Sequence, residues 1–227
     1  MQARLASETD LAGFREEARL LLRRQVPPEA VHWETAQAQN SDQFADPAGE
    51  RPRDMPKAAS AIVPASFLRL CEVVVLHHDP DRFALLYRLL WRLVHEPGLR
   101  NDPVDPDMLH AHQMAQSVRR DLHKMKAFVR FRAIPLEQAP PLHLAWYEPA
   151  HHLLEAAAPW FAKRGPPGRW AIFTPERSVE SDGQRLHYGP GVPRSRVPPA
   201  EASDAAWLDC YHGVFDRQPT PGEPQTP

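Results

Sequence analysis

The sequence predicts an α+β fold, with an N-terminal helical half followed by an antiparallel sheet of four or five strands that has helices packed on one face. Two observations lead to this prediction. Between Met108 and Met125, apolar residues recur at alternating steps of three and four, which is typical of one face of a helix. From Lys126 onward the step becomes two, which is typical of a strand.

The chain has 227 residues, the length of one domain, and 42% of them are hydrophobic, which is enough for a core in part of the chain. We predict a single α+β domain over residues 1–215, with a mobile loop at about 34–60. A disordered tail rich in proline is predicted at 216–227. The loop prediction rests on a polar stretch without periodicity, which has little apolar surface to offset the entropy lost on ordering.

The charge and the cysteines narrow the class of protein. A formal net charge of −2 excludes a general attraction to nucleic acid or acidic membranes, so any such contact needs a local patch. Cys71 and Cys210 lie in apolar contexts without a CxxC spacing, so we expect buried thiols in a reducing compartment. No apolar run resembles a signal peptide or a membrane span. We expect a cytoplasmic protein without a membrane partner.

The chain begins with a predicted helix that Asp10 or Thr9 caps, with Phe14 among the residues of its buried stripe. Pro27-Pro28 ends this helix, and a short strand is predicted at 31–33.

Three further helices are predicted before residue 124. The first covers 67–76. Asp79-Pro80-Asp81 and Asp105-Pro106-Asp107 each supply a cap, a proline at the first helical position and an acid in the first turn, so a helix is predicted after each. The helix after Asp79 is apolar almost all round and stops at Pro97-Gly98, which is typical of a helix at the centre of a core.

The second half of the chain is predicted to form strands around one more helix. In order, the sequence predicts a strand at 126–134, a strand at 142–147, a helix opened by Glu148-Pro149 and kinked or ended by Pro159, a strand at 169–174, a hairpin at 177–188 and a last helix from about 203 to 215. Asp182-Gly183 suits a two-residue type I′ turn in the hairpin.

The segment from Arg119 to Arg132 carries the clearest functional signal among the residues. It holds six Lys or Arg residues against a single Asp. In the predicted strand, the core-facing side chains alternate with a basic face that also carries one aromatic ring. Such a face suits phosphates, with the ring available for base stacking. The predicted nucleic-acid-binding residues are Arg119, His123, Lys124, Lys126, Phe128, Arg130 and Arg132.

This basic segment also allows structural roles. The basic face can be a solvated sheet face, or Arg130 and Arg132 can pair with carboxylates such as Glu148 or Glu155. Phe128 can be a stacking platform for a base, or a ring that packs beneath the long Lys and Arg stems.

A second candidate site lies at Glu148-Pro149-Ala150-His151-His152. In a helix that starts here, His151 and Glu155 share a face, which suits an acid/base pair or two metal ligands. The N–H groups at the N-terminus of such a helix also suit an anion, to which His152 can add a donor. Purely structural histidines are the alternative. The candidate catalytic residues are His123, Glu148, His151 and His152.

No common motif settles the chemistry. The chain has no zinc-finger spacing, Walker loop, dinucleotide fingerprint or GxSxG, so we expect no metal and no cofactor, and leave open whether the protein is an enzyme. His77-His78 is expected to interact only with the end of the helix before it.

Several segments together match a known pattern. His123-Lys124-Met125 with Phe128-Val129-Arg130-Phe131-Arg132 is its most specific piece. The other segments are 27–31, 78–80, 82–93, 118–132, 146–151, 156–161, 170–175 and 188–191. On these residues the chain resembles an uncharacterised bacterial domain found fused to X-type uracil-DNA glycosylases or encoded beside radical-SAM DNA-repair proteins.

The resemblance implies a role in DNA metabolism or repair beside a glycosylase or radical-SAM partner, and implies no established reaction. Two departures matter. No glycosylase domain follows, so we do not expect this chain to excise uracil by that route. The family pattern usually continues after the last helix with a basic segment and ends in aromatic residues. This chain continues instead with Asp216-Arg217-Gln218-Pro219 and a proline-rich tail.

The function predicted first is therefore a DNA-binding accessory module in DNA repair, with a single strand or a flipped base as the favoured ligand. The alternative is a catalytic domain that acts on nucleic acid through a His/Glu site. The second alternative is a protein-interaction scaffold.

Overall fold

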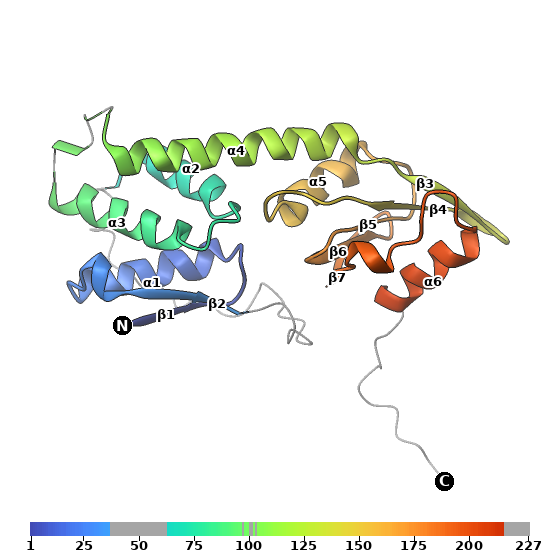
Figure 1. Ribbon diagram of the computed structural model, residues 1–227, viewed down its shortest axis with the longest axis horizontal. Helices are drawn as coiled ribbons and strands as arrows, with labels where there is room; N and C mark the ends of the chain where they lie inside the picture. Colours follow the sequence, from blue (N-terminus) through green and yellow to red (C-terminus); the bar gives the residue numbers. More distant parts are fainter. Residues whose placement is uncertain (37–62, 97, 100–101, 103, 216–227) are drawn as a thin grey trace, which may run out of the picture. The chain divides into compact units, whose positions relative to one another are not determined.

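The computed structural model describes residues 1–36, 63–96, 98–99, 102 and 104–215 (Figure 1). They form two compact units: unit 1 contains residues 1–123 and 150–152, and unit 2 contains residues 124–149 and those from 153 onward. The prediction of a single domain over 1–215 stays a prediction. The predicted tail and all but the first residues of the predicted loop lie outside the described residues.

Unit 1 is mainly helical, as predicted. Its helices are α1 (Leu11–Arg23), α2 (Ala65–Val74), α3 (Arg82–His95) and α4 (Pro106–Phe128), which continues into unit 2. The acidic caps explain two of the starts, because Asp10 accepts a hydrogen bond from Gly13 N at 2.8 Å and Asp105 accepts one from Met108 N at 2.9 Å.

The core of unit 1 is built around α3, as its apolar composition predicts. Leu86, Tyr87 and Leu89 have no exposed surface. A small parallel sheet completes the unit: β1 (Gln2–Leu5) pairs with β2 (His32–Thr35). The strand near residue 32 is confirmed, whereas β1 was missed because its four residues offer too short a pattern.

Unit 2 contains a five-stranded sheet in the order β3-β4-β5-β6-β7. The strands are β3 (Arg132–Leu136), β4 (Ala139–Trp146), β5 (Trp170–Phe173), β6 (Arg177–Ser181) and β7 (Leu186–Pro190), and the helices are α5 (Leu154–Arg164) and α6 (Asp204–Phe215). The α+β class is confirmed. The sheet is mixed, because β4 and β5 run parallel on either side of α5 in the chain.

The two helices of unit 2 cover different faces of the sheet. Every residue of β5 is buried. Trp170 packs against Phe161 of α5, whereas Ala171 and Phe173 belong to the cluster that contains Trp207 of α6. Since alternate residues of a strand point to opposite faces, α5 and α6 lie on opposite sides rather than forming one layer.

The predicted strand at 126–134 is wrong in its first half. α4 runs to Phe128, and Val129 N still donates to Met125 O at 3.1 Å, so the strand β3 starts only at Arg132. The apolar residues Leu122, Met125 and Val129 continue the helical spacing, and this period overrides the short alternation that overlaps it.

The predicted helix start at Glu148-Pro149 is also wrong. α5 begins at Leu154, and it does not end at Pro159 but continues to Arg164. The Asp121 carboxylate accepts the backbone N–H groups of Ala150 and His151, at 2.8 and 3.1 Å, which holds this segment in a turn.

The hairpin at 177–188 is confirmed with a different turn. The register pairs Ser181 with Leu186, and Asp182 N donates to Arg185 O, which leaves Gly183-Gln184 as the loop. Only Gly183 of these two has a positive φ, of 95°, as in a type II′ turn rather than the predicted type I′.

Both cysteines are free, with Cys71 buried and Cys210 half-buried. Burial raises the pKa of the Cys71 thiol to about 12, so it stays neutral and unreactive. No helix among the described residues is both long enough and apolar enough to cross a membrane.

Candidate nucleic-acid interface

A groove in unit 2 combines positive charge with aromatic rings. Its volume is about 540 Å³, and we call it the arginine groove. The residues that line it are Arg130, Phe131, Arg132, Leu144, Trp146, Arg194, Pro198, Ala200 and Trp207. Among these described lining residues there is no carboxylate, so the groove offers cations and ring faces to an anionic, aromatic ligand.

Trp146 and Arg194 form the rigid part of the groove. The Arg194 guanidinium lies 4.8 Å from the centre of the Trp146 ring. Trp146 Nε1 donates to Val192 O at 3.0 Å, which fixes the ring while the guanidinium stacks on it. Neither Trp146 nor Arg194 is among the nucleic-acid-binding residues predicted from the sequence.

Arg130 and Arg132 differ in their freedom to bind a ligand. Arg130 is exposed and donates to Ala127 O at 2.7 Å, so it also completes the end of α4. Arg132 donates to Asp204 Oδ1 at 2.8 Å and to Ala200 O at 2.7 Å. The predicted alternative of a carboxylate partner is thus confirmed for Arg132, with Asp204 in place of Glu148 or Glu155.

The other predicted binding residues lie on α4, including Lys126 and Phe128, which were predicted to lie on a strand. Arg119, His123 and Lys124 are exposed there. Lys126 is half-buried, with its ammonium 5.7 Å from the centre of the Trp160 ring. Phe128 is 61% exposed at the end of the helix. The ring is therefore accessible from solvent, and its predicted role in base stacking stays a prediction.

The candidate catalytic residues belong to both units. Glu148 is exposed in unit 2, whereas His123, His151 and His152 belong to unit 1. His151 lies against Ser117, which is on the same face of α4 as Asp121. His123 is two residues beyond Asp121, and two residues turn a helix by about 200°, so His123 points away from that face.

The prediction that His151 and Glu155 share a helix face is wrong, because α5 begins only at Leu154. Glu155 instead forms a salt bridge with Arg177 in unit 2. His152 donates its backbone N–H to Leu76 O at 3.0 Å, and its Nε2 lies 3.8 Å from the Glu8 carboxylate.

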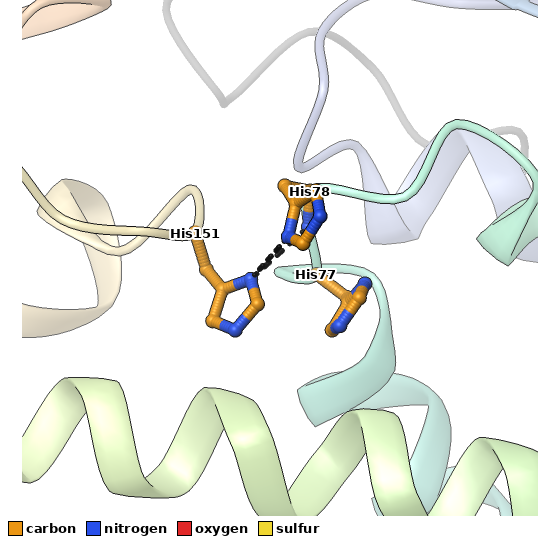
Figure 2. Close-up of side chains that lie close together, drawn as sticks. All are labelled: His77, His78 and His151. Atoms are coloured by element: carbon orange, nitrogen blue, oxygen red, sulfur yellow. Dashed lines mark hydrogen bonds between the residues drawn. The ribbon is translucent and has the colours of Figure 1, made fainter.

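Unit 1 brings three histidines together that the sequence did not group. His77 and His78 follow α2, and His151 comes from the short segment 150–152 (Figure 2). One possible ligand atom from each residue lies within 4.8 Å of the other two. The adjacent histidine pair was visible in the sequence, but no spacing rule connects it to a residue more than seventy positions later.

Two imidazoles of this cluster, those of His77 and His151, have lowered pKa values. Desolvation by burial, followed by the charges of His151 and His78, lowers the pKa of His77 to about 4. Burial also lowers the pKa of His151, with Asp121 opposing the shift. Neutral imidazoles have free lone pairs at neutral pH, which suits both hydrogen bonding and metal binding.

Comparison with protein families identifies the chain. Residues 80–216, more than half of the sequence, match a domain of unknown function, DUF4130. The chain belongs to the DUF4130 family. The DUF4130 match runs from α3 to α6, so it includes every residue that lines the arginine groove, and also His151, but begins just after His78. Comparisons with curated proteins and with solved structures gave no match.

Proposed function

We propose that the protein is a DNA-binding accessory module whose arginine groove holds single-stranded DNA. The observation that carries this proposal is the lining of the groove, where the exposed Arg130 and Arg194 can contact phosphates beside the half-buried ring of Trp146. Proteins that bind single strands combine these two elements, a positive groove along the backbone and aromatic rings for the bases.

Phe128 adds a further aromatic ring to the proposed interface. It is the exposed ring two residues before Arg130, and the exposed Lys124 lies one helical turn before it on α4. Arg132 contributes less net charge than Arg130 or Arg194 because Asp204 already pairs with it. We assign it the role of shaping the groove wall.

The cellular part of the proposal rests on the resemblance described above. The module acts in DNA repair, beside a partner enzyme of the glycosylase or radical-SAM type. A module that binds a single strand suits such a partner, because enzymes that act on a base need it unpaired or flipped out of the duplex.

Charge removal in the groove tests the binding directly. Affinity of the wild type for a labelled single strand should fall steeply with salt, because bound phosphates release counterions. In Arg130→Gln/Arg194→Gln, the slope of log affinity against log salt should be smaller by roughly two, about one for each lost phosphate contact. The measurement is fluorescence anisotropy at several salt concentrations.

The matched control is Arg185→Gln. Arg185 is exposed at the β6–β7 turn of the same unit and does not line the groove. Its loss should leave the salt slope unchanged. Equal slopes for all three proteins, or a wild type that does not bind at low salt, would contradict the proposal and favour the protein-interaction scaffold.

Phe128→Leu separates stacking from charge. Leucine keeps much of the apolar volume but has no ring face, so single-strand affinity should fall by about 1–3 kcal/mol. Affinity for a matched duplex, which depends on phosphates, should change much less. Anisotropy on both substrates at one fixed salt concentration makes the comparison, with the melting temperature checked alongside. An equal loss on both substrates would leave Phe128 without a stacking role.

A further inference from the structure

The histidine cluster of unit 1 has the chemistry of a metal-binding site. His78 Nδ1 lies 2.9 Å from His151 Nδ1, and the His77 ring lies 4.4 Å from the His151 ring between centroids. Figure 2 shows the three rings meeting from two separate segments of the chain. Two ring nitrogens so close can share one proton, or they can share a cation in its place.

Two residues of α4 position His151 through hydrogen bonds. Ser117 Oγ lies 2.9 Å from His151 Nε2, and the Asp121 carboxylate accepts the His151 backbone N–H at 3.1 Å. In the tautomer in which Nε2–H donates to Ser117 Oγ, the lone pair of His151 is on Nδ1, which faces His78 and accepts its backbone N–H at 3.3 Å. Metal-binding histidines are usually oriented in this way, by a partner on the second ring nitrogen.

A small cavity lies beside the cluster. It has a volume of about 240 Å³, and His78 lines it together with Glu8, Trp33, Thr35, Pro80, Arg82, Phe83 and His152. Trp33 Nε1 is buried and has no hydrogen-bond partner among the described residues. The cavity itself has room for water or a small ligand.

We propose that His77, His78 and His151 bind a divalent first-row transition-metal ion, represented by Zn²⁺, with a fourth position open toward this cavity. Three imidazole ligands suit this group of ions and suit Mg²⁺ or Ca²⁺ poorly, because the latter prefer oxygen ligands. Structural zinc sites use four protein ligands, whereas sites with three keep a position for water or substrate. This proposal does not depend on the arginine groove.

The test uses the full chain, first treated with a chelator. Co²⁺ reports on its own coordination through visible d–d absorption, and Zn²⁺ competition then gives the affinity. We expect one Co²⁺ per chain, an intense absorption of the four-coordinate type, and displacement by Zn²⁺. No absorption, or only the weak absorption of hydrated Co²⁺, would overturn the proposal.

Variants show which residues bind the ion. His78→Ala removes an exposed ligand, so the fold should be kept while the absorption is lost. Ser117→Ala removes the partner of His151 Nε2 and should weaken Zn²⁺ binding by about 10–100-fold. The control is His112→Ala, an exposed histidine elsewhere on α4, which should bind like the wild type. Wild-type binding in His78→Ala would also overturn the proposal, because the ion would then be elsewhere.

Discussion

Replacing Arg82 with methionine is expected to lower the free energy of unfolding by about 3–5 kcal/mol. Arg82 is 1% exposed and donates to Val75 O at 3.0 Å, to Asp79 O at 2.9 Å and to Glu8 Oε2 at 2.6 Å. Methionine fills much of the volume but donates no hydrogen bond, so buried carbonyl groups lose their donor. Urea denaturation followed by circular dichroism measures the loss.

The control for Arg82 is Arg4→Met. Arg4 is largely exposed and pairs with Glu34 only at 3.9 Å, so its loss should change the free energy of unfolding by less than about 1 kcal/mol. Equal effects of the two substitutions would show that the buried network does not stabilise unit 1.

The stability lost in Arg82→Met should also depend on pH. Burial alone would raise the pKa of the Glu8 carboxyl, but hydrogen bonds from Thr35 and Arg82 and the Arg82 charge hold it below its usual range. A carboxyl group with a lowered pKa stabilises the fold at neutral pH, and this stability is lost as the pH falls through its pKa in the folded state. The difference between wild type and variant should therefore shrink in acid.

Gly191→Ala is expected to damage the arginine groove and to lower the free energy of unfolding by about 1–3 kcal/mol. A Cβ atom at this position would lie 2.1 Å from Pro175 O and 2.5 Å from Glu176 C, so the backbone must move. The next residue, Val192, accepts the Trp146 Nε1 hydrogen bond and donates its N–H to Thr174 O at 2.8 Å. Moving it displaces Trp146, and single-strand affinity should fall as well.

Gly213→Ala is the matched control for this substitution. Gly213 lies in α6 with no atom within 4 Å of an added Cβ, and alanine favours a helix by up to about 1 kcal/mol over glycine. Stability should stay the same or rise, with affinity unchanged. Unaltered stability and affinity in Gly191→Ala would mean that the close approach to Pro175 does not position the groove.

Local signals predicted much of the fold. The Asp10 and Asp105 caps and the apolar α3 are read from neighbouring residues, and the structure confirms each of them. The errors occur where a local pattern competes with a distant contact. The turn at Ala150 depends on Asp121, which is far away in the sequence, so Glu148-Pro149 looked like a helix start.

The candidate sites likewise combine parts that local sequence predicts with parts that depend on distant contacts. The basic segment up to Arg132 was visible in the sequence because its charges are contiguous. The groove itself needs Trp146 and Arg194, and the histidine cluster needs His77 beside His151, so both depend on tertiary packing. Such groupings follow no sequence period, and only the three-dimensional structure shows them.

Ultraviolet cross-linking tests the central claim, that single-stranded DNA lies in the arginine groove. A labelled single strand is irradiated with the full chain, and the cross-linked peptides are identified by mass spectrometry. We predict cross-links in the peptides that contain Phe128, Trp146 and Arg194, and their loss in Arg130→Gln/Arg194→Gln. Cross-links confined to peptides of unit 1, or unchanged in the double variant, would contradict the account.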